Sequence, residues 1–124
     1  MTIKDPNHGR KPNQKLKPYL VLQYLLRESD SENTVSATAI IEELESMGID
    51  AERRSIYTDI EEINKAMLVA ERRRDGDDEY TLSDAEEELA DKQFGENAKY
   101  IVYNKNKKGF YVRERRFEID EIRL

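Results

Sequence analysis

A three-residue link between two helical stretches restricts the fold of this chain more than any other feature. Apolar residues recur at intervals of three and four through residues 37–47, and Gly48 follows where a helix end favours glycine. Only Gly48, Ile49 and Asp50 precede the next helical stretch. Its apolar residues, spaced by four, three and four, are Ile56, Ile60, Ile63 and Met67. Such a turn is typical of a helix-turn-helix, although a plain helical hairpin of a bundle has the same spacing.

A further amphipathic helix is predicted ahead of these two, over residues 16–27. Pro18 fits in its first turn, where the missing N–H leaves no hydrogen bond unmade. The apolar residues define one wide buried face: Leu16, Tyr19, Leu20, Leu22, Leu25 and Leu26. Ser36 and Asp50 have side chains that cap helix N-termini, and we expect them to start the next two helices.

Two short runs of aromatic and β-branched residues follow, at residues 100–103 and 110–112. The polar link at residues 104–109 contains asparagine and glycine, which predicts a β-hairpin. The fold class is therefore expected to be mainly α with a small β-hairpin. Three helices followed by a hairpin is the element order of a winged helix-turn-helix, a three-helix core plus a wing, which we place at residues 15–112.

The charges of this chain are segregated along the sequence. The chain has 21 Lys and Arg against 27 Asp and Glu, a net charge of −6, which alone argues against a nucleic-acid partner. Residues 75–98 contain ten of the acids and one lysine, a local charge of −9, which leaves +3 for the rest. We expect an acidic insert with a short helix after a capping box at residues 83–86. A solubilising loop explains the same composition.

The exposed face of the second helix of the pair indicates contact with DNA. In a helix-turn-helix this would be the recognition helix, at residues 51–65, whose N-terminal half meets base edges. Side chains in that half can all donate hydrogen bonds: Arg53, Arg54, Ser55, Tyr57 and Thr58. Arg54 is the candidate for a bidentate contact to guanine. Acidic residues in the second half of the helix would repel phosphates if the helix lay flat in the groove. They therefore predict that the helix approaches DNA end-on. A solvated arginine pair is the alternative interpretation.

The predicted hairpin turn adds a second group of cations. Lys105, Lys107 and Lys108 lie near its tip and suit contact with phosphates or the minor groove. A lysine-rich turn also keeps proteins soluble and protects strand edges. If both groups of cations bind DNA, we expect the acidic insert to compete for them, so that its removal tightens binding.

Other classes of function lack the residues they need. No cysteine is present, and the only histidine, His8, lies in residues 1–14, which are expected to form a disordered tail. No Ser/His/Asp set can be assembled, so we predict no enzyme, no catalytic residue, no metal and no cofactor. The longest apolar run, residues 19–26, is too short to cross a membrane, and no secretory signal is present. We expect a cytoplasmic protein.

Residues 50–63 (DAERRSIYTDIEEI) resemble the recognition helix of DeoR-like winged-helix regulators, which often read Arg-x-Thr-Ile/Val-Tyr-Arg-Asp-Ile. The wider resemblance is to the N-terminal domain of bacterial WYL-domain transcriptional regulators, and it covers residues 15–74 and 99–124. The segments that carry it are residues 20–26 (LVLQYLL), 108–112 (KGFYV) and 115–124 (RRFEIDEIRL). The chain departs from the motif at Thr58, where arginine is usual, and in the length of the acidic insert.

The resemblance implies the sequence-specific DNA-binding domain of a regulator, with double-stranded DNA as its partner and a homodimer that reads paired half-sites. Residues 113–124 would begin the helix that connects to a C-terminal ligand-sensing domain, which this chain does not contain, or would pack on a partner subunit. The alternative function is a winged-helix protein-interaction module that uses the acidic insert or the C-terminal helix and does not bind DNA.

Overall fold

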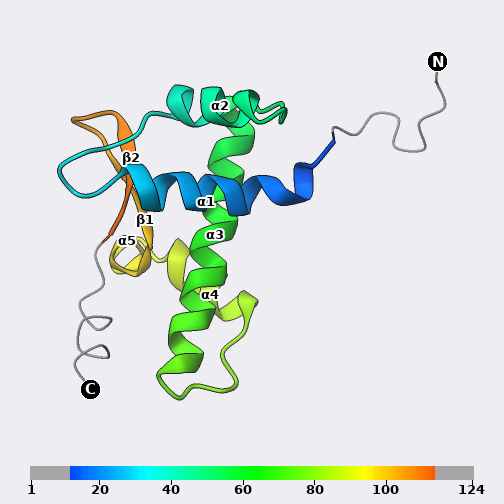
Figure 1. Ribbon diagram of the computed structural model, residues 1–124. Coiled ribbons are helices and arrows are strands. Elements are labelled where there is room, and N and C mark those ends of the chain that lie inside the picture. Colours follow the sequence, from blue (N-terminus) through cyan, green and yellow to red (C-terminus); the bar gives the residue numbers. More distant parts are fainter. Residues whose placement is uncertain (1–11, 114–124) are drawn as a thin grey trace, which may run out of the picture.

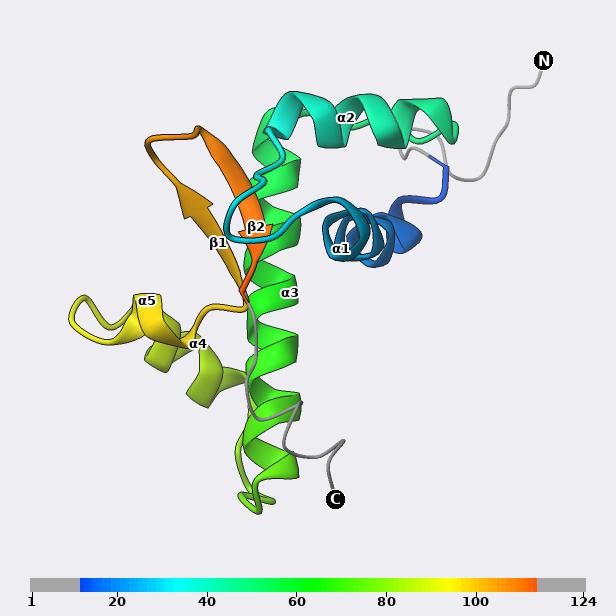
Figure 2. The ribbon, with the colours of Figure 1, turned by 60° about the vertical axis from the view of Figure 1, so that its left-hand side comes forward.

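The structure is a computed structural model that describes residues 12–113. It is mainly helical with a two-stranded antiparallel hairpin, as predicted (Figure 1, Figure 2). In chain order the elements are the 3-10 helix η1 (Gln14–Leu16), α1 (Lys17–Glu28), α2 (Ala37–Ser46), α3 (Arg53–Arg74), α4 (Leu82–Ala90), α5 (Gly95–Ala98), β1 (Ile101–Asn104) and β2 (Gly109–Val112). The predicted tail, residues 1–14, and connecting helix, residues 113–124, lie outside the described residues except for residues 12–14 and Arg113.

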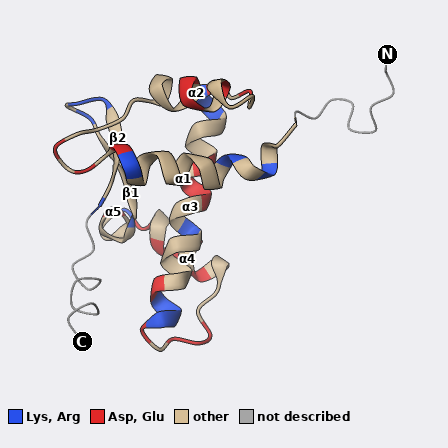
Figure 3. Cartoon of the chain, in the orientation of Figure 1, with Lys and Arg blue, Asp and Glu red and all other residues tan. Residues whose placement is uncertain are grey.

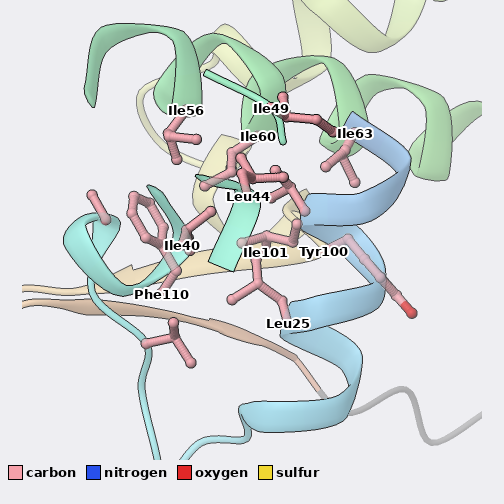
Figure 4. Close-up of a cluster of buried hydrophobic side chains, with 13 residues drawn as sticks. Leu25, Ile40, Leu44, Ile49, Ile56, Ile60, Ile63, Tyr100, Ile101 and Phe110 are labelled. Carbon is pink, nitrogen blue, oxygen red and sulfur yellow. The ribbon is translucent and has the colours of Figure 1, made fainter. Parts of the chain in front are cut away.

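One hydrophobic core joins α1, α2, the N-terminal half of α3 and the hairpin (Figure 4). The spacing of apolar residues predicted its helical members. Its largest fully buried side chains are Val21, Leu25, Ile40, Leu44, Ile56 and Ile101. Burial of one such side chain stabilises a fold by roughly 1.5–3 kcal/mol. These contacts therefore fix the first three helices and the hairpin relative to one another.

The turn between α2 and α3 has the predicted glycine geometry. Gly48 has a φ of 88°, which residues with a side chain disfavour. The N–H of Ile49 donates to a carbonyl oxygen of α2, and its side chain enters the core. The N-cap of α3 is Glu52 rather than Asp50. The Glu52 N–H donates to Ser55 Oγ at 3.2 Å, and Ser55 Oγ donates back to the Glu52 carbonyl oxygen at 2.8 Å.

The predicted helix at residues 51–65 is only the first part of α3, which continues to Arg74. Leu68 explains the extension, because it is buried with Tyr80 and Ala85 in a second hydrophobic cluster. These partners belong to the acidic insert, whose helix α4 lies against the C-terminal half of α3 (Figure 1). The insert is therefore a folded helical unit rather than a loop.

The hairpin is tied to the helices on two sides. Val35, before α2, pairs with Phe110 as a one-residue strand: the Val35 N–H donates to the Phe110 carbonyl oxygen at 2.8 Å, and the reverse bond is 2.7 Å. Asn64 of α3 holds the other side. Its Oδ1 accepts from the N–H groups of Tyr100 (2.9 Å) and Ile101 (2.7 Å), and its Nδ2 donates to the Ile101 carbonyl oxygen at 3.1 Å.

α1 buries a narrower face than the sequence predicts. Pro18 lies in the first turn as expected. The side facing α3 carries Lys17, Val21 and Leu25, and Lys17 forms a buried ion pair with Asp59 of α3. The sequence predicts a single wide buried face, but part of that face is exposed. The exposed large apolar residues are Leu16, Tyr19 and Leu26.

Candidate nucleic-acid interface

The N-terminal half of α3 and the hairpin lie side by side around one buried aromatic ring. Phe110 of β2 contacts Tyr57 of α3, with ring centroids 5.7 Å apart, and Tyr103 of β1, at 4.9 Å. Both tyrosines are partly exposed, at 41% and 42%. Predicted cations of the two elements are therefore carried on neighbouring parts of the molecule, and we call their combined surface the basic face. Its cations are Arg53, Arg54, Lys105, Lys107 and Lys108, all of them exposed.

Two consecutive arginines open α3. Arg53 Nη2 donates to Oγ1 of Thr38 at 3.0 Å, which holds this guanidinium beside the start of α2. Arg54 is exposed, and within residues 12–113 its guanidinium has no hydrogen-bond or ion-pair partner. Cations at a helix N-terminus oppose the helix dipole by roughly 0.3–1 kcal/mol. Neither a local hydrogen bond nor the helix dipole stabilises a cation at position 54. Arg54 is therefore the cation best placed to meet an external anion.

The two hydroxyl side chains of the predicted site are engaged within α3. Ser55 is half-buried and its hydroxyl donates to the Glu52 carbonyl oxygen. Thr58 Oγ1 donates to the carbonyl oxygen of Arg54 at 3.3 Å. Each hydroxyl oxygen keeps acceptor capacity, but its single proton is used locally. Ser55 and Thr58 are therefore weaker donors to a phosphate than the sequence suggests.

The hairpin tip is shaped by its own side chains. The N–H of Lys107 donates to Oδ1 of Asn104 at 2.9 Å, and Lys108 has a φ of 57°. Lys107 Nζ donates to the carbonyl oxygen of Glu32 at 2.8 Å, which links the tip to the loop between α1 and α2. The tip lysines lie in the turn at one end of the hairpin (Figure 3). They form a compact cationic group that is braced against the helical core.

Carboxylates border both groups of cations. Asp30 lies in the loop beside the hairpin tip, and hydrogen bonds from backbone N–H groups of that loop, with a smaller contribution from Lys107, lower its pKa. Beside the start of α3, Asp50 and Glu52 share a shallow hollow with Arg54. The basic face can therefore meet a polyanion only where its cations reach past these acids. This arrangement favours a few defined contacts over a broad phosphate surface.

The loop that begins the acidic insert lies at the end of α3 opposite to Arg54, α4 lies against the C-terminal half of α3, and α5 lies beside β1 (Figure 1). Leu68, where the insert packs, is about 21 Å from Arg54 along the helix axis at 1.5 Å per residue. Arg72 pairs with Glu88 of α4, and Tyr80 Oη donates to Glu88 at 2.6 Å. Burial alone would raise the pKa of Glu88, but these two bonds lower it. Docked in this position, the insert does not cover Arg54 or the hairpin tip, which argues against direct competition for them.

Two residues at the basic face were missed by sequence reasoning. Tyr103 could have been found, because the predicted turn at residues 104–109 places it opposite Phe110 across the hairpin. Thr38 carries no such signal, since its contact with Arg53 depends on the angle between α2 and α3. The interface therefore gains one residue that the hairpin pattern predicts and one that only packing reveals.

The described residues were also considered for metals and membranes. Within residues 12–113, no group of three or more His, Asp or Glu side chains is placed to hold a metal ion. In the same range, no helix combines the length and the apolar character needed to cross a membrane. Comparisons of the chain with protein-family models, with curated proteins and with solved structures find no match.

Proposed function

We propose that this chain is a winged helix-turn-helix domain that binds double-stranded DNA sequence-specifically in a bacterial transcriptional regulator. The observation that carries the proposal is the basic face: exposed cations from the start of α3 and from the hairpin tip, on two elements packed around Phe110. In such domains a helix in the position of α3 enters the major groove and the hairpin contacts neighbouring phosphates or the minor groove. The resemblance to WYL-domain regulators assigns the same roles.

The distribution of charge along α3 favours an end-on approach to the groove. Arg53 and Arg54 lie in the first turn, whereas Glu61 and Glu62 are exposed farther along. A helix lying flat in the groove would bring these carboxylates close to phosphates, which repel them. Entry by the first two turns alone keeps the arginines at the bases and the acids outside.

The two exposed tyrosines extend the proposed contact between the grooves. Tyr57 belongs to the helix and Tyr103 to the wing, and both rings rest on Phe110. A DNA strand that separates the major from the minor groove would pass between these two elements. The phenol hydroxyls then suit hydrogen bonds to the phosphates of that strand.

The proposal includes a cytoplasmic homodimer that reads paired half-sites, as in the regulators that the sequence resembles. It assigns this chain the DNA-binding role and leaves ligand sensing to a further domain. Sedimentation equilibrium with and without a palindromic duplex measures the stoichiometry. We expect two chains on each duplex, and one chain on each duplex would remove the dimer from the proposal.

DNA binding can be tested with the 124-residue chain and duplexes selected from a random library. The logarithm of affinity, measured by fluorescence anisotropy, should fall linearly with the logarithm of salt, with a slope of about 0.9 for each phosphate contacted. Arg53→Ala/Arg54→Ala should weaken binding by at least about tenfold, because a good base contact contributes roughly 1–3 kcal/mol. Lys92→Ala, which removes an exposed lysine of the insert, should change nothing. Failure to select any duplex would overturn the proposal, as would equal binding by both variants.

The acidic insert favours a second candidate function, a protein-interaction module. Leu82 and Phe94 are 57% and 59% exposed among its carboxylates, a surface that suits a basic amphipathic peptide. This function predicts no duplex binding at low salt, together with binding of such a peptide that Leu82→Ser/Phe94→Ser abolishes. Binding of a selected duplex by the same double variant would support the first function instead.

A further inference from the structure

α1 is apolar on two opposite sides, and only one of them is buried. The side that faces α3 carries Val21 and Leu25, both fully buried. On the opposite side, Leu16, Tyr19 and Leu26 are 53%, 62% and 45% exposed, and their spacings of three and seven align them along the helix. We call these three residues the outer face of α1, counting Leu16, which is the N-cap of α1. Helical phase sets this face opposite to Val21 and Leu25, and so away from α3. Gln23 is an exposed polar residue on this face, and an apolar stripe of this kind on a helix normally faces another packed element.

The chain leaves the described residues beside the C-terminal end of α1. Ser29 is the C-cap of α1, and its Oγ accepts a hydrogen bond from the Val112 N–H at 3.0 Å. The end of β2 is thus tied to this end of α1 (Figure 1). Arg113 follows, and then residues 114–124. These eleven residues would span about 16 Å as a helix and up to about 36 Å extended, enough to run along α1, which is about 18 Å long.

The charges of this segment are ordered in a way that matches α1. Residues 114–116 contain two arginines and one acid, and residues 118–121 contain three acids and no base. Arg113 is not part of this pattern, because its guanidinium donates to the carbonyl oxygens of Glu96 and Asn97. On α1, Glu28 is exposed at the C-terminal end and Lys15 is exposed just before the N-terminal end, and the helix dipole has the same signs. A segment that runs back along α1 brings Arg115 and Arg116 to Glu28, which also pairs with Arg27 at 3.0 Å, and its acids to Lys15. Its apolar residues are Phe117, Ile119, Ile122 and Leu124.

We propose that residues 114–124 pack along the outer face of α1, antiparallel to it. Three exposed side chains are too few for two free chains to associate, since specific interfaces bury about 1,200–2,000 Å² and one large aromatic side chain about 150–250 Å². A tethered segment meets the face at an effective concentration in the millimolar range, so that a small contact suffices. Because the outer face lies away from α3, the packing leaves the basic face open and does not depend on DNA binding.

Disulfide trapping tests the proposal, because the chain contains no cysteine of its own. The pair Tyr19→Cys/Ile119→Cys joins the outer face to the segment, and Lys105→Cys/Ile119→Cys is the matched control at the hairpin tip. Air oxidation, followed by mass spectrometry and non-reducing electrophoresis, should give an intramolecular disulfide at least about tenfold faster in the first pair. Equal rates in the two pairs would overturn the proposal. Faster formation of disulfide-linked dimers by the single variant Tyr19→Cys would also overturn it and assign the face to a second copy.

Hydroxyl-radical footprinting of the full chain gives an independent measurement without cross-links. Phe117→Ser/Ile122→Ser should raise the oxidation rates of Tyr19 and Leu26 by at least about twofold, because both lose their cover, while the buried Leu25 stays protected. Phe94→Ser removes an exposed aromatic residue of the acidic insert and should leave these rates unchanged. Unchanged rates in the double variant, with its helical circular dichroism intact, contradict the packing of the segment on α1.

Discussion

Asn64 shows how one buried polar side chain can set the position of a whole element. It lies within α3 at 4% exposure, and both ends of its amide bond to the backbone where β1 begins. A hydrophobic residue of similar size would leave two N–H groups and one carbonyl oxygen without partners. The side chain therefore substitutes for a neighbouring strand, and it fixes the hairpin beside the N-terminal half of α3.

Replacement of Asn64 should destabilise the fold strongly. Asn64→Ala leaves buried backbone groups unpaired, and we expect the free energy of unfolding to fall by about 2–4 kcal/mol. Urea unfolding followed by circular dichroism measures this loss. Asn97→Ala removes the same amide from an exposed position and should cost less than about 0.5 kcal/mol. Equal losses in the two variants would show that Asn64 has no special role.

Arg54 and Lys107 should affect DNA binding in different ways. Arg54→Ala removes the proposed base contact, so affinity for the selected duplex should fall by roughly 1–3 kcal/mol while affinity for unrelated duplexes changes little. Lys107→Ala removes a phosphate contact, so affinity should fall evenly for all sequences and the salt slope should drop by about one. Anisotropy titrations with matched and scrambled duplexes separate the two. An even loss in both variants would make Arg54 a backbone contact.

The cationic residues of the basic face could be predicted from the sequence because charge and helical phase are local properties. Arg53, Arg54 and the hairpin lysines are all exposed where the pattern places them. The bonding of Ser55 and Thr58 could not be predicted, because it depends on which residue caps α3. Once Glu52 rather than Asp50 takes that position, the Ser55 hydroxyl is committed to the helix start.

At the scale of elements, the positions of the helices can be predicted from the spacing of apolar residues. The length of α3 cannot be predicted in this way. The apolar spacing predicts the core side of α3, and Gly48 predicts where the turn lies. The continuation to Arg74 depends on Leu68, whose cover comes from residues of the acidic insert later in the chain. Composition shows that the insert is acidic, but it cannot show that Tyr80 and Ala85 return to α3.

The docking of α4 should weaken in acid. The pKa of Glu88 is lowered in the fold by its bonds from Tyr80 and Arg72, against the opposing effect of burial. A lowered pKa means that the stabilisation is present above the ordinary value of 4.5 and is lost as pH falls below it. Hydrogen exchange should therefore rise in residues 80–90 at acid pH before it rises in α1.

Glu88→Gln provides the control for this pH dependence. Its amide cannot titrate, so exchange in residues 80–90 should be faster than in the parent chain at neutral pH and should no longer depend on acid. If the variant shows the same rise in exchange on acidification as the parent chain, another carboxylate holds α4 in place.

For the whole molecule, the acidic insert should act on DNA binding through its field rather than by contact. Its buried contact at Leu68 lies about 21 Å from Arg54 along α3. Glu86 of α4 shares a hollow with Glu61, which is about 10 Å from Arg54 along the helix, so the nearest carboxylates of the insert lie at about the screening length of 10 Å at 0.1 M salt. Three exposed acids can be neutralised without touching the docking contacts: Asp78→Asn, Glu79→Gln and Glu87→Gln. This variant should bind DNA more tightly at about 0.01 M salt and equally at about 0.15 M. Equal tightening at both salt concentrations would instead support direct competition between the insert and DNA.

The length of α3 has a consequence for cooperativity. One uninterrupted helix passes through two separate hydrophobic clusters, the main core at its N-terminal half and the cluster of Leu68 at its C-terminal half. The smaller cluster has fewer buried side chains, so this end of the molecule should open first in partial unfolding while the helix start stays folded. The domain thus consists of two folding units that share a single backbone axis. Loss of the packing of the insert would therefore unfold the C-terminal part of α3 and leave the N-terminal part, which carries Arg54, folded.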